Sequence, residues 1–357
     1  MRWDALTDTD AGALPGLSLR QVAAVPGRIR TIAAPEFHGM VFHEVMAKSL
    51  LNSVSHGAKM PFEWSINPYR GCSHACVYCY ARGSHRYLDM DVGNDFDSQI
   101  VVKVNAEEVL RRELSAPTWN HERVALGTNT DPYQRTEGRY QLMPGIIAAL
   151  AESRTSFSIL TKGTLLRRDL AQLAEAKQRV QIGLSMSIAV GESKLQKLVE
   201  PGTPSARARL ETVAAAVEAG FDVTVFMMPI LPYLSDSVRD LLPLLRGIKE
   251  AGAKSAVYSP LFLRSHMKPW FMQWLVANYP DVVDKYLDLY PGRASRANAA
   301  YRKALASRIK PIIVGLGLRD DGSFGYKKRG KDVVAGLAMP PSPFVEQTLP
   351  AEQPMLF

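Results

Sequence analysis

Cysteine is scarce in this chain of 357 residues: there are three, and all of them lie between positions 72 and 79. An odd number of thiols in one short run excludes a framework of structural disulfides, which needs pairs and an oxidising, secretory context. Because no cysteine lies elsewhere in the sequence, a second cysteine-ligated cluster is excluded as well. Any metal or redox chemistry of thiols must therefore belong to this one segment.

Long apolar stretches are also missing, although 46% of the residues are hydrophobic. No run approaches the roughly 18–20 apolar residues that a membrane-spanning helix needs. The first residues, MRWDALTDTDAG, carry early acidic side chains and no apolar core, which is not the pattern of a signal peptide. We therefore expect a cytoplasmic protein that makes no membrane contact, and nothing in the composition defines its oligomeric state.

The three cysteines, Cys72, Cys76 and Cys79, have the spacing C-x3-C-x2-C. Three thiolates on one tight loop can bind three irons of a 4Fe-4S cluster and leave the fourth iron without a protein ligand. Clusters that only carry electrons usually close all four corners, whereas an open iron invites a second ligand. The run therefore predicts a site of chemistry rather than a simple electron carrier.

A zinc site is the main alternative for the same loop, with His74 as a fourth ligand beside the three cysteines. Structural zinc usually takes two pairs of ligands from separate segments. Here all four candidates share one loop, and His74 lies between two of the cysteines, so a common ion is hard to reach. Under this alternative the protein would be a non-enzymatic, zinc-stapled nucleic-acid-binding module, and chemically inert thiols are the remaining interpretation.

The cysteine run and its flanks, SINPYRGCSHACVYCYAR at residues 65–82, resemble the cluster loop of radical S-adenosylmethionine (SAM) enzymes. The resemblance implies a 4Fe-4S cluster whose open iron binds the amino and carboxylate groups of SAM, with Tyr78 packed beside the adenine. It also implies that the reduced cluster cleaves SAM to a 5′-deoxyadenosyl radical, which abstracts hydrogen from a substrate. Such an enzyme would need a reducing partner such as flavodoxin or ferredoxin, while the protein contributes positioning and exclusion of water.

Further segments of the chain are similar to the spore photoproduct lyase-like branch of that family. They are GTNTDPYQRTE (127–137), ILTKGTLLRRD (159–169), SMSIA (185–189), EPGTPSARARLE (200–211) and MMPILPYLSD (227–236). Spore photoproduct lyases use an additional downstream cysteine as a hydrogen donor, and this chain has none. We therefore do not expect thymine-dimer repair itself. Either a tyrosine such as Tyr258, Tyr286 or Tyr301 is the donor, or the reaction differs, and the catalytic residues are not assigned.

The first of these segments places polar side chains just past a predicted strand. Thr128, Thr130 and Asp131 can offer hydroxyls and a carboxylate to the methionine amino group or the ribose of SAM. The alternative is an Asx turn leading into Pro132, in which the aspartate side chain accepts a hydrogen bond from the backbone. The sequence leaves both interpretations open.

Lys162 ends an apolar predicted strand, and an unpaired buried charge is very costly, so its ammonium must meet an anion or water. The SAM carboxylate is a natural partner, and the resemblance gives the matching lysine a similar role. Ser185 and Ser187 share one face of the next strand. The resemblance favours Ser187 as a cofactor contact. Glu200 and Arg209 either form a structural ion pair or contact the ribose.

Predicted strands alternate with helical stretches from residue 61 onward, which indicates a parallel sheet covered by helices. The resemblance implies an α/β fold, the partial six-stranded (β/α) barrel of its family, with chemistry at the C-terminal strand ends. We expect an N-terminal leader that packs on the barrel at 1–60, the barrel at 61–262, a mostly helical, basic extension at 263–335 and a Pro-rich, disordered tail at 336–357. Within the leader, residues 42–54 are predicted to form a short helix. The expected strands are 63–66, 98–104, 123–127, 156–161, 180–188, 222–228 and 254–258.

Positive charge is concentrated in residues 293–331, which hold eleven lysines and arginines but only two acidic residues. This excess of nine positive charges exceeds the net charge of +8 of the whole chain, so the remainder is close to neutral. A localised basic segment favours contact with nucleic acid, and the alternative is a solvated helix face. Helical spacing would place Arg296, Lys303 and Lys310 on one face. The substrate is therefore either nucleic acid, for repair or modification, or a small molecule or peptide.

Overall fold

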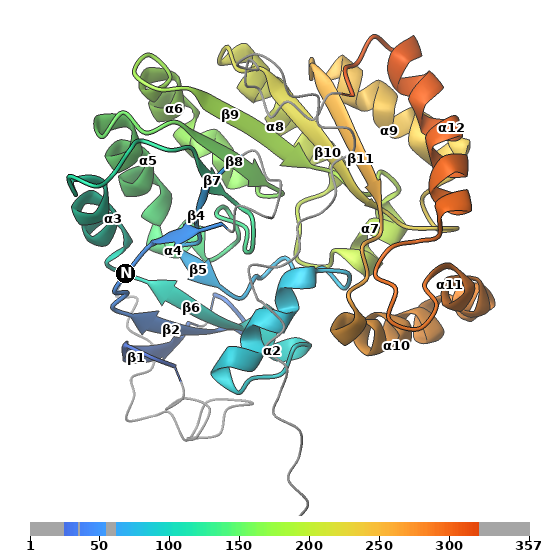
Figure 1. Ribbon diagram of the computed structural model, residues 1–357, viewed down its shortest axis with the longest axis horizontal. Helices are drawn as coiled ribbons and strands as arrows, with labels where there is room; N and C mark the ends of the chain where they lie inside the picture. Colours follow the sequence, from blue (N-terminus) through green and yellow to red (C-terminus); the bar gives the residue numbers. More distant parts are fainter. Residues whose placement is uncertain (1–24, 35, 55–61, 321–357) are drawn as a thin grey trace, which may run out of the picture.

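The computed structural model describes residues 25–34, 36–54 and 62–320, and its main body is a curved sheet with helices on its outer side (Figure 1). The strand order is β11-β10-β9-β8-β7-β4-β3. The first six strands are parallel, while β3 is antiparallel to β4 at one edge. In the described ranges the two edge strands do not pair with each other, so the predicted partial six-stranded barrel is confirmed in an open form. The strands are β3 (Leu51–Ser53), β4 (Trp64–Ile66), β7 (Val124–Leu126), β8 (Phe157–Thr161), β9 (Ile182–Ser187), β10 (Val223–Ile230) and β11 (Ser255–Pro260).

Helices follow the parallel strands along the chain and pack on the outer face of the sheet. Ile159, Leu184 and Val223 lie side by side in the register of β8, β9 and β10 and are buried. Leu150 and Leu173, on the covering helices, belong to the same hydrophobic core. This burial is the main free-energy gain that holds the C-terminal strand ends in place. The helical segments are η3 (Tyr80–Leu88), α2 (Asn94–Ser98), α3 (Ala106–Leu114), α4 (Glu137–Tyr140), α5 (Leu142–Glu152), η4 (Thr164–Asp169), α6 (Leu170–Ala176), α7 (Ser193–Val199), α8 (Ala206–Glu218) and α9 (Val238–Glu250).

A second, four-stranded sheet of order β1-β2-β6-β5 overturns two expectations from the sequence. Residues 42–54 do not form a helix, because β2 (Val41–Val45) and β3 take up most of them. Strand β2 is paired on both edges and buried at every position, so tertiary pairing overrides its local preference. The strand predicted at 98–104 is present as β6 (Gln99–Lys103), but it belongs to this second sheet and not to the barrel. The other two strands are β1 (Arg28–Ala33) and β5 (Tyr69–Arg70).

The C-terminal part of the described chain is helical, as predicted, and its last helix packs against α9 and β11. Asn298 caps this helix by accepting a hydrogen bond from the backbone N–H of Tyr301. Arg296 therefore precedes the helix and does not share a face with Lys303 and Lys310, contrary to the prediction from helical spacing. Lys303 and Lys310 are both exposed. The segments are η5 (Ser265–Met267), α10 (Lys268–Asn278), η6 (Pro280–Val282), α11 (Val283–Leu289) and α12 (Ala299–Gly315).

Several expected regions lie outside the described residues. They are the first part of the leader at 1–24, the end of the basic segment at 321–331 and the Pro-rich tail at 336–357. Among the helices of the described ranges, none is both long enough and apolar enough to cross a membrane.

Candidate active site

The three cysteines lie on the loop that connects β5 to η3, and all three thiols are free. The side chain of Gln134, which follows β7, fixes the start of this loop. Its Oε1 accepts a hydrogen bond from the backbone N–H of Ser73 at 2.8 Å, and its Nε2 donates to the carbonyl of Gly71 at 3.0 Å. Both backbone contacts flank Cys72, so the loop has a defined shape set by the protein.

The turn after α7 packs directly onto the same loop. The backbone N–H of Gly202 donates to the carbonyl of His74 at 3.1 Å. A Cβ atom at position 202 would lie 1.9 Å from the carbonyl oxygen of Ser73, so only glycine allows this approach. The EPGTP segment at 200–204 thus packs against the cysteine loop and fixes its position. This role was not predicted from the sequence.

The donor set of the loop fits a 4Fe-4S cluster better than a single zinc ion. Burial and the neighbouring Cys72 thiol together raise the pKa of Cys79 to about 11. Burial and Glu200 raise the pKa of Cys76. In the described part of the chain no three His, Cys, Asp or Glu side chains gather as ligands of one ion. Each thiolate of a cluster binds a different iron, so the three sulfurs need not converge on one point.

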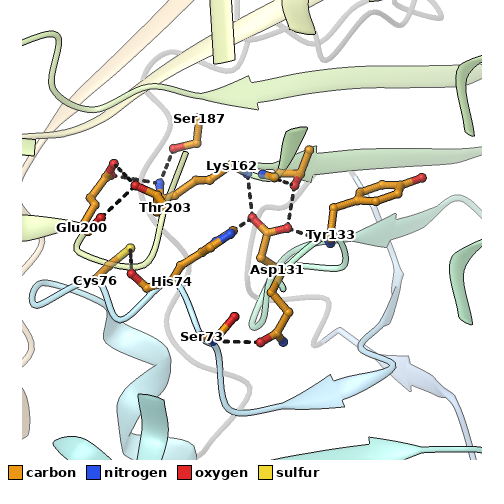
Figure 2. A network of polar contacts seen from close by, with 12 residues as sticks. Ser73, His74, Cys76, Asp131, Tyr133, Lys162, Ser187, Glu200 and Thr203 are labelled. Carbon is orange, nitrogen blue, oxygen red and sulfur yellow. Dashed lines mark hydrogen bonds and ion pairs between the residues drawn. The ribbon is translucent and has the colours of Figure 1, made fainter. Parts of the chain in front are cut away.

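Asp131 is buried at the centre of a network that joins three segments (Figure 2). Its Oδ1 accepts hydrogen bonds from the backbone N–H of Tyr133 at 2.8 Å and from the Thr161 hydroxyl at 2.5 Å. Its Oδ2 accepts from the backbone N–H of Lys162 at 2.6 Å and lies 3.3 Å from Nδ1 of His74. Burial would raise the pKa of Asp131, but His74 and these donors outweigh it and lower the pKa. Both carboxylate oxygens therefore have protein partners, and the contact with Tyr133 is that of an Asx turn.

The two threonines of the same segment differ in their surroundings. Thr130 is buried, and its hydroxyl donates to the carbonyl of Tyr69 at 2.9 Å, which ties this loop to the second sheet. Its backbone N–H donates to Oδ1 of Asn67. Thr128 is half-buried, and its carbonyl accepts a hydrogen bond from the Tyr80 hydroxyl. Thr128 is thus the more accessible of the two.

Lys162 lies in a second network, which also reaches the cysteine loop (Figure 2). Its Nζ donates to the Ser187 hydroxyl at 2.5 Å and lies 3.5 Å from Oε1 of Glu200. The fully buried Glu200 also accepts from Arg209 at 2.7 Å and from the hydroxyl of Tyr78. Burial would raise the pKa of Glu200, but Arg209 and Lys162 outweigh it and lower the pKa to about 2. This carboxylate is therefore ionised at neutral pH and joins the cysteine loop to the ends of β8 and β9.

The predicted site residues fall into two groups around the loop. Tyr78 and Lys162 both contact Glu200, and Ser187 accepts a hydrogen bond from Lys162, whereas Thr130 and Asp131 face protein partners. The contact of His74 with Asp131 was not predicted from the sequence, although both residues belong to the motifs at 65–82 and 127–137. Of the three tyrosines considered as hydrogen donors, Tyr301 donates to Asp236 at 2.8 Å, and the hydroxyl of Tyr286 is buried without a partner among the described residues. The third, Tyr258, is half-buried on β11.

Curated relatives of the chain are uncharacterized proteins. It is 50% identical over 312 residues to proteins of Mycobacterium tuberculosis and Mycobacterium bovis, and the match covers 87% of this chain and 90% of each relative. It is 28% identical over 239 residues to a protein of Methanocaldococcus jannaschii, covering 67% of this chain and 83% of that protein. These relatives carry no assigned reaction.

Solved structures with a similar fold include spore photoproduct lyase complexed with dinucleoside spore photoproduct. That likeness has a TM-score of 0.58 at 17% identity and covers 78% of this chain and 80% of the other. A variant of spore photoproduct lyase with bound AdoMet and dinucleoside spore photoproduct gives a TM-score of 0.60 at 16% identity, with 85% of each chain covered. At these identities the likeness concerns the fold alone.

A family model described as the radical SAM superfamily matches residues 66–245, just over half of the chain. The match contains the cysteine loop, the parallel strands β7 to β10 and both buried networks. Enzymes of this superfamily use a 4Fe-4S cluster and SAM, and they generally need a reductant. The observed fold agrees with that assignment, and the chain therefore belongs to the radical SAM superfamily, as an enzyme whose reaction is not assigned.

Proposed function

We propose that this protein binds a 4Fe-4S cluster through Cys72, Cys76 and Cys79 and uses it with SAM to abstract hydrogen from a substrate. The observation that supports this most is the joining of the cysteine loop to Lys162. Tyr78, one residue before the last cysteine, shares the carboxylate of Glu200 with Lys162. If the cysteine loop had only a structural role, it would not need a buried connection through Glu200 to Lys162, whose side chain remains 14% exposed.

The bound cluster and SAM would supply the reductive cleavage that generates a carbon-centred radical. The protein would supply the positions of the groups around them. In the proposal Lys162 binds the carboxylate of SAM, while Ser187, already within hydrogen-bond distance of its ammonium, contacts the same end of the cofactor. Glu200 holds the Tyr78 hydroxyl and the Lys162 ammonium at the same carboxylate, which fixes the Tyr78 ring that is to pack beside the adenine.

Thr128, Thr130 and Asp131 would act differently from one another. Thr128 is half-buried at the end of β7, and we propose it as a direct contact of the cofactor amino group or ribose. The hydroxyl of Thr130 and both oxygens of Asp131 already have protein partners. We therefore propose that these two residues shape the site by holding the loops, with Asp131 fixing the backbone of Lys162.

A nucleic acid is the substrate class that we favour. Lys303 and Lys310 are exposed on α12 in the basic part of the chain, and basic surfaces bind phosphates. Spore photoproduct lyase, whose fold is similar, has been solved with a dinucleoside. Because this chain has no fourth cysteine, we do not propose the same repair reaction. A small molecule or peptide is the second candidate, because the exposed lysines of α12 are equally consistent with a solvated helix face.

The test of the chemistry is anaerobic reconstitution of the full chain, followed by iron and sulfide analysis and measurement of 5′-deoxyadenosine formed from SAM after reduction. About four irons per chain and reductant-dependent 5′-deoxyadenosine are expected. Zinc at one ion per chain, with no iron bound and no SAM cleavage, would instead support the zinc-stapled alternative. The proposed location is the cytoplasm, where reducing conditions preserve thiols.

The test of the substrate is binding to DNA and RNA across a range of salt concentrations. Changing Lys303 and Lys310 to Gln should lower the slope of log affinity against log salt by about 0.7–0.9 per lost phosphate contact. Changing Lys177 and Arg179 to Gln removes the same charge just before the N-terminal end of β9, outside the basic segment, and should leave the slope unchanged. Equal slopes in all variants, or no binding by the parent, would favour the small-molecule or peptide candidate.

A further inference from the structure

Arg82 is a fully buried cation that lies directly beside the cysteine loop. It stands three residues after Cys79, on η3, and its Nε donates a hydrogen bond to the carbonyl of Cys76 at 2.9 Å. A guanidinium keeps its positive charge throughout the ordinary pH range. Because burial of a charge is costly unless the charge is paired and hydrogen-bonded, the partners of Arg82 decide whether it can remain there.

The remaining contacts of Arg82 pair its charge and use most of its donors. Nη1 donates to the carbonyls of Val92 at 3.2 Å and Gly93 at 2.7 Å. Nη2 donates to Oδ2 of Asp97 at 2.9 Å, which completes an ion pair. The Asp97 side chain is 21% exposed, whereas that of Arg82 is 0% exposed. Water therefore screens the carboxylate of this pair more than the guanidinium.

Two aromatic rings enclose the guanidinium. Its central carbon lies 5.3 Å from the ring centroid of Phe96 on α2 and 4.9 Å from that of Trp270 on α10. Phe96 belongs to the same apolar cluster as Cys72, and Cys79 packs against that cluster. The carbonyl of Phe96 also accepts a hydrogen bond from the backbone N–H of Cys72 at 2.9 Å. Protein atoms rather than water therefore fill the space between Arg82 and the thiols, and a charge acts more strongly through such a medium.

We propose that Arg82 is a positioning residue of the cysteine loop whose buried charge raises the reduction potential of the bound cluster. The inference rests on the proposed function, because it requires a 4Fe-4S cluster on Cys72, Cys76 and Cys79. One-electron reduction makes the cluster more negative by one charge, and a cation held nearby in a water-poor surrounding stabilises that added charge. Asp97 acts with the opposite sign, and its exposure to water weakens its effect.

The experiment measures the reduction potential of the cluster on the reconstituted full chain. Dithionite lowers the solution potential stepwise in the presence of redox mediators at about pH 8, and electron paramagnetic resonance reports the reduced cluster. Arg82→Met removes the charge and should lower the equilibrium constant for one-electron reduction roughly 10-fold, which corresponds to about 59 mV. Arg82→Lys keeps the charge, and its potential should lie between those of Arg82→Met and the parent.

Asp97→Asn tests the same electrostatics with the opposite sign. Burial raises the pKa of Asp97 to about 6, against the lowering effect of Arg82, so this carboxylate is ionised at about pH 8. Loss of its negative charge should make the cluster easier to reduce. The rise in potential should be smaller than the fall in Arg82→Met, because water already screens part of the carboxylate charge.

Arg82→Met leaves the Asp97 carboxylate without its counterion, and such a loss can prevent folding. The double variant Arg82→Met with Asp97→Asn removes both charges together. Its potential should still lie below that of the parent, because the guanidinium is the more deeply buried of the two groups. The double variant takes the place of Arg82→Met if the single variant binds no iron, and a potential equal to or above that of the parent would then overturn the inference.

Arg111→Met is the matched control, because it removes an exposed arginine on α3 whose partners are Glu107 and Glu152. Its cluster should have the potential of the parent. The inference is overturned if the Arg82 and Asp97 variants shift the potential in the same direction, or if neither variant shifts it while the cluster is fully assembled. A parent that assembles no cluster would instead contradict the proposed function, and this inference would fail with it.

Discussion

Two buried carboxylates flank the cysteine loop, and they are built in different ways. Asp131 accepts hydrogen bonds from two backbone N–H groups and a hydroxyl, with His74 nearby. Glu200 instead meets two cationic side chains, Lys162 and Arg209, and the hydroxyl of Tyr78. The first arrangement fixes two backbone N–H groups, and its partner His74 lowers the pKa of Asp131, whereas the second balances the charges of two cationic side chains.

Lys162 joins the two carboxylates, because its backbone N–H is bonded to Asp131 and its ammonium faces Glu200. The backbone of Lys162 is therefore fixed, while its ammonium can leave Glu200 and bind another carboxylate. A ligand carboxylate can replace part of the contact with Glu200 without moving the strand end. We infer that Asp131 fixes the position of the Lys162 backbone, and that Glu200 holds the Lys162 ammonium in place until a ligand binds.

The largest expected effect comes from the loop between the two carboxylates. Each of Cys72→Ala, Cys76→Ala and Cys79→Ala should abolish the 4Fe-4S absorption and electron paramagnetic resonance signals and stop SAM cleavage. The reason is that no other thiol exists in the chain to replace a lost ligand. Circular dichroism of the unloaded variants serves as the fold control, and a variant that retained full cleavage would contradict the cluster assignment.

Glu200→Gln should be the most destabilising change at the carboxylates, by about 3–5 kcal/mol, because it leaves buried cations without their counterion. Arg209 is fully buried, so water cannot take over the lost contact. Urea denaturation of the unloaded chain measures the effect. A loss of less than 1 kcal/mol would mean that Glu200 is not the centre of charge balance in this network.

The acid dependence of stability gives a second test of Glu200. Its pKa is about 2 in the folded chain against an ordinary value of 4.5, so its contribution is present above pH 4.5 and is lost as the pH falls toward 2. A shift of that size corresponds to roughly 3 kcal/mol. The parent should therefore lose more stability than Glu200→Gln between pH 4.5 and 2, and parallel curves would contradict the assignment.

Asp131→Asn should cost less, about 1–3 kcal/mol, because the remaining amide oxygen can still accept from neutral donors. The amide nitrogen, however, cannot accept from the donors that it now faces, such as the backbone N–H of Lys162. The same urea experiment measures it beside Glu200→Gln. If Asp131→Asn and Glu200→Gln lowered the free energy of unfolding equally, the proposed difference between the roles of Asp131 and Glu200 would be wrong.

Lys162→Met should affect cofactor binding more than folding. We expect SAM affinity of the reconstituted chain to fall by about 1–3 kcal/mol, the size of a charge-assisted hydrogen bond, with a smaller change in melting temperature. Lys194→Met, an exposed lysine on α7, is the matched control and should bind SAM as the parent does. Unchanged affinity together with a lower melting temperature would assign Lys162 to structure alone.

Much of the molecule follows from local patterns in the sequence. The spacing of the three cysteines predicted one cluster loop, and the alternation of apolar strands with helical stretches predicted a parallel sheet, which is confirmed. That this sheet forms a partial barrel was implied by the family resemblance. Such features depend on residues that are close in the chain, so spacing and periodicity reveal them. The roles predicted for Tyr78, Thr128, Thr130, Asp131, Lys162 and Ser187 as cofactor contacts stay predictions.

Other features were decided only by the tertiary structure. Strand β2 was predicted as helix because its burial comes from pairing with β1 and β6, which no local pattern records. The contact between Tyr78 and Glu200 joins residues 122 positions apart, and that between His74 and Asp131 brings two quoted motifs together. The sequence by itself determined which side chains the protein can use near the cysteines. Only folding decided which of them face each other, because that choice depends on how strands distant in the chain align at one edge of the sheet.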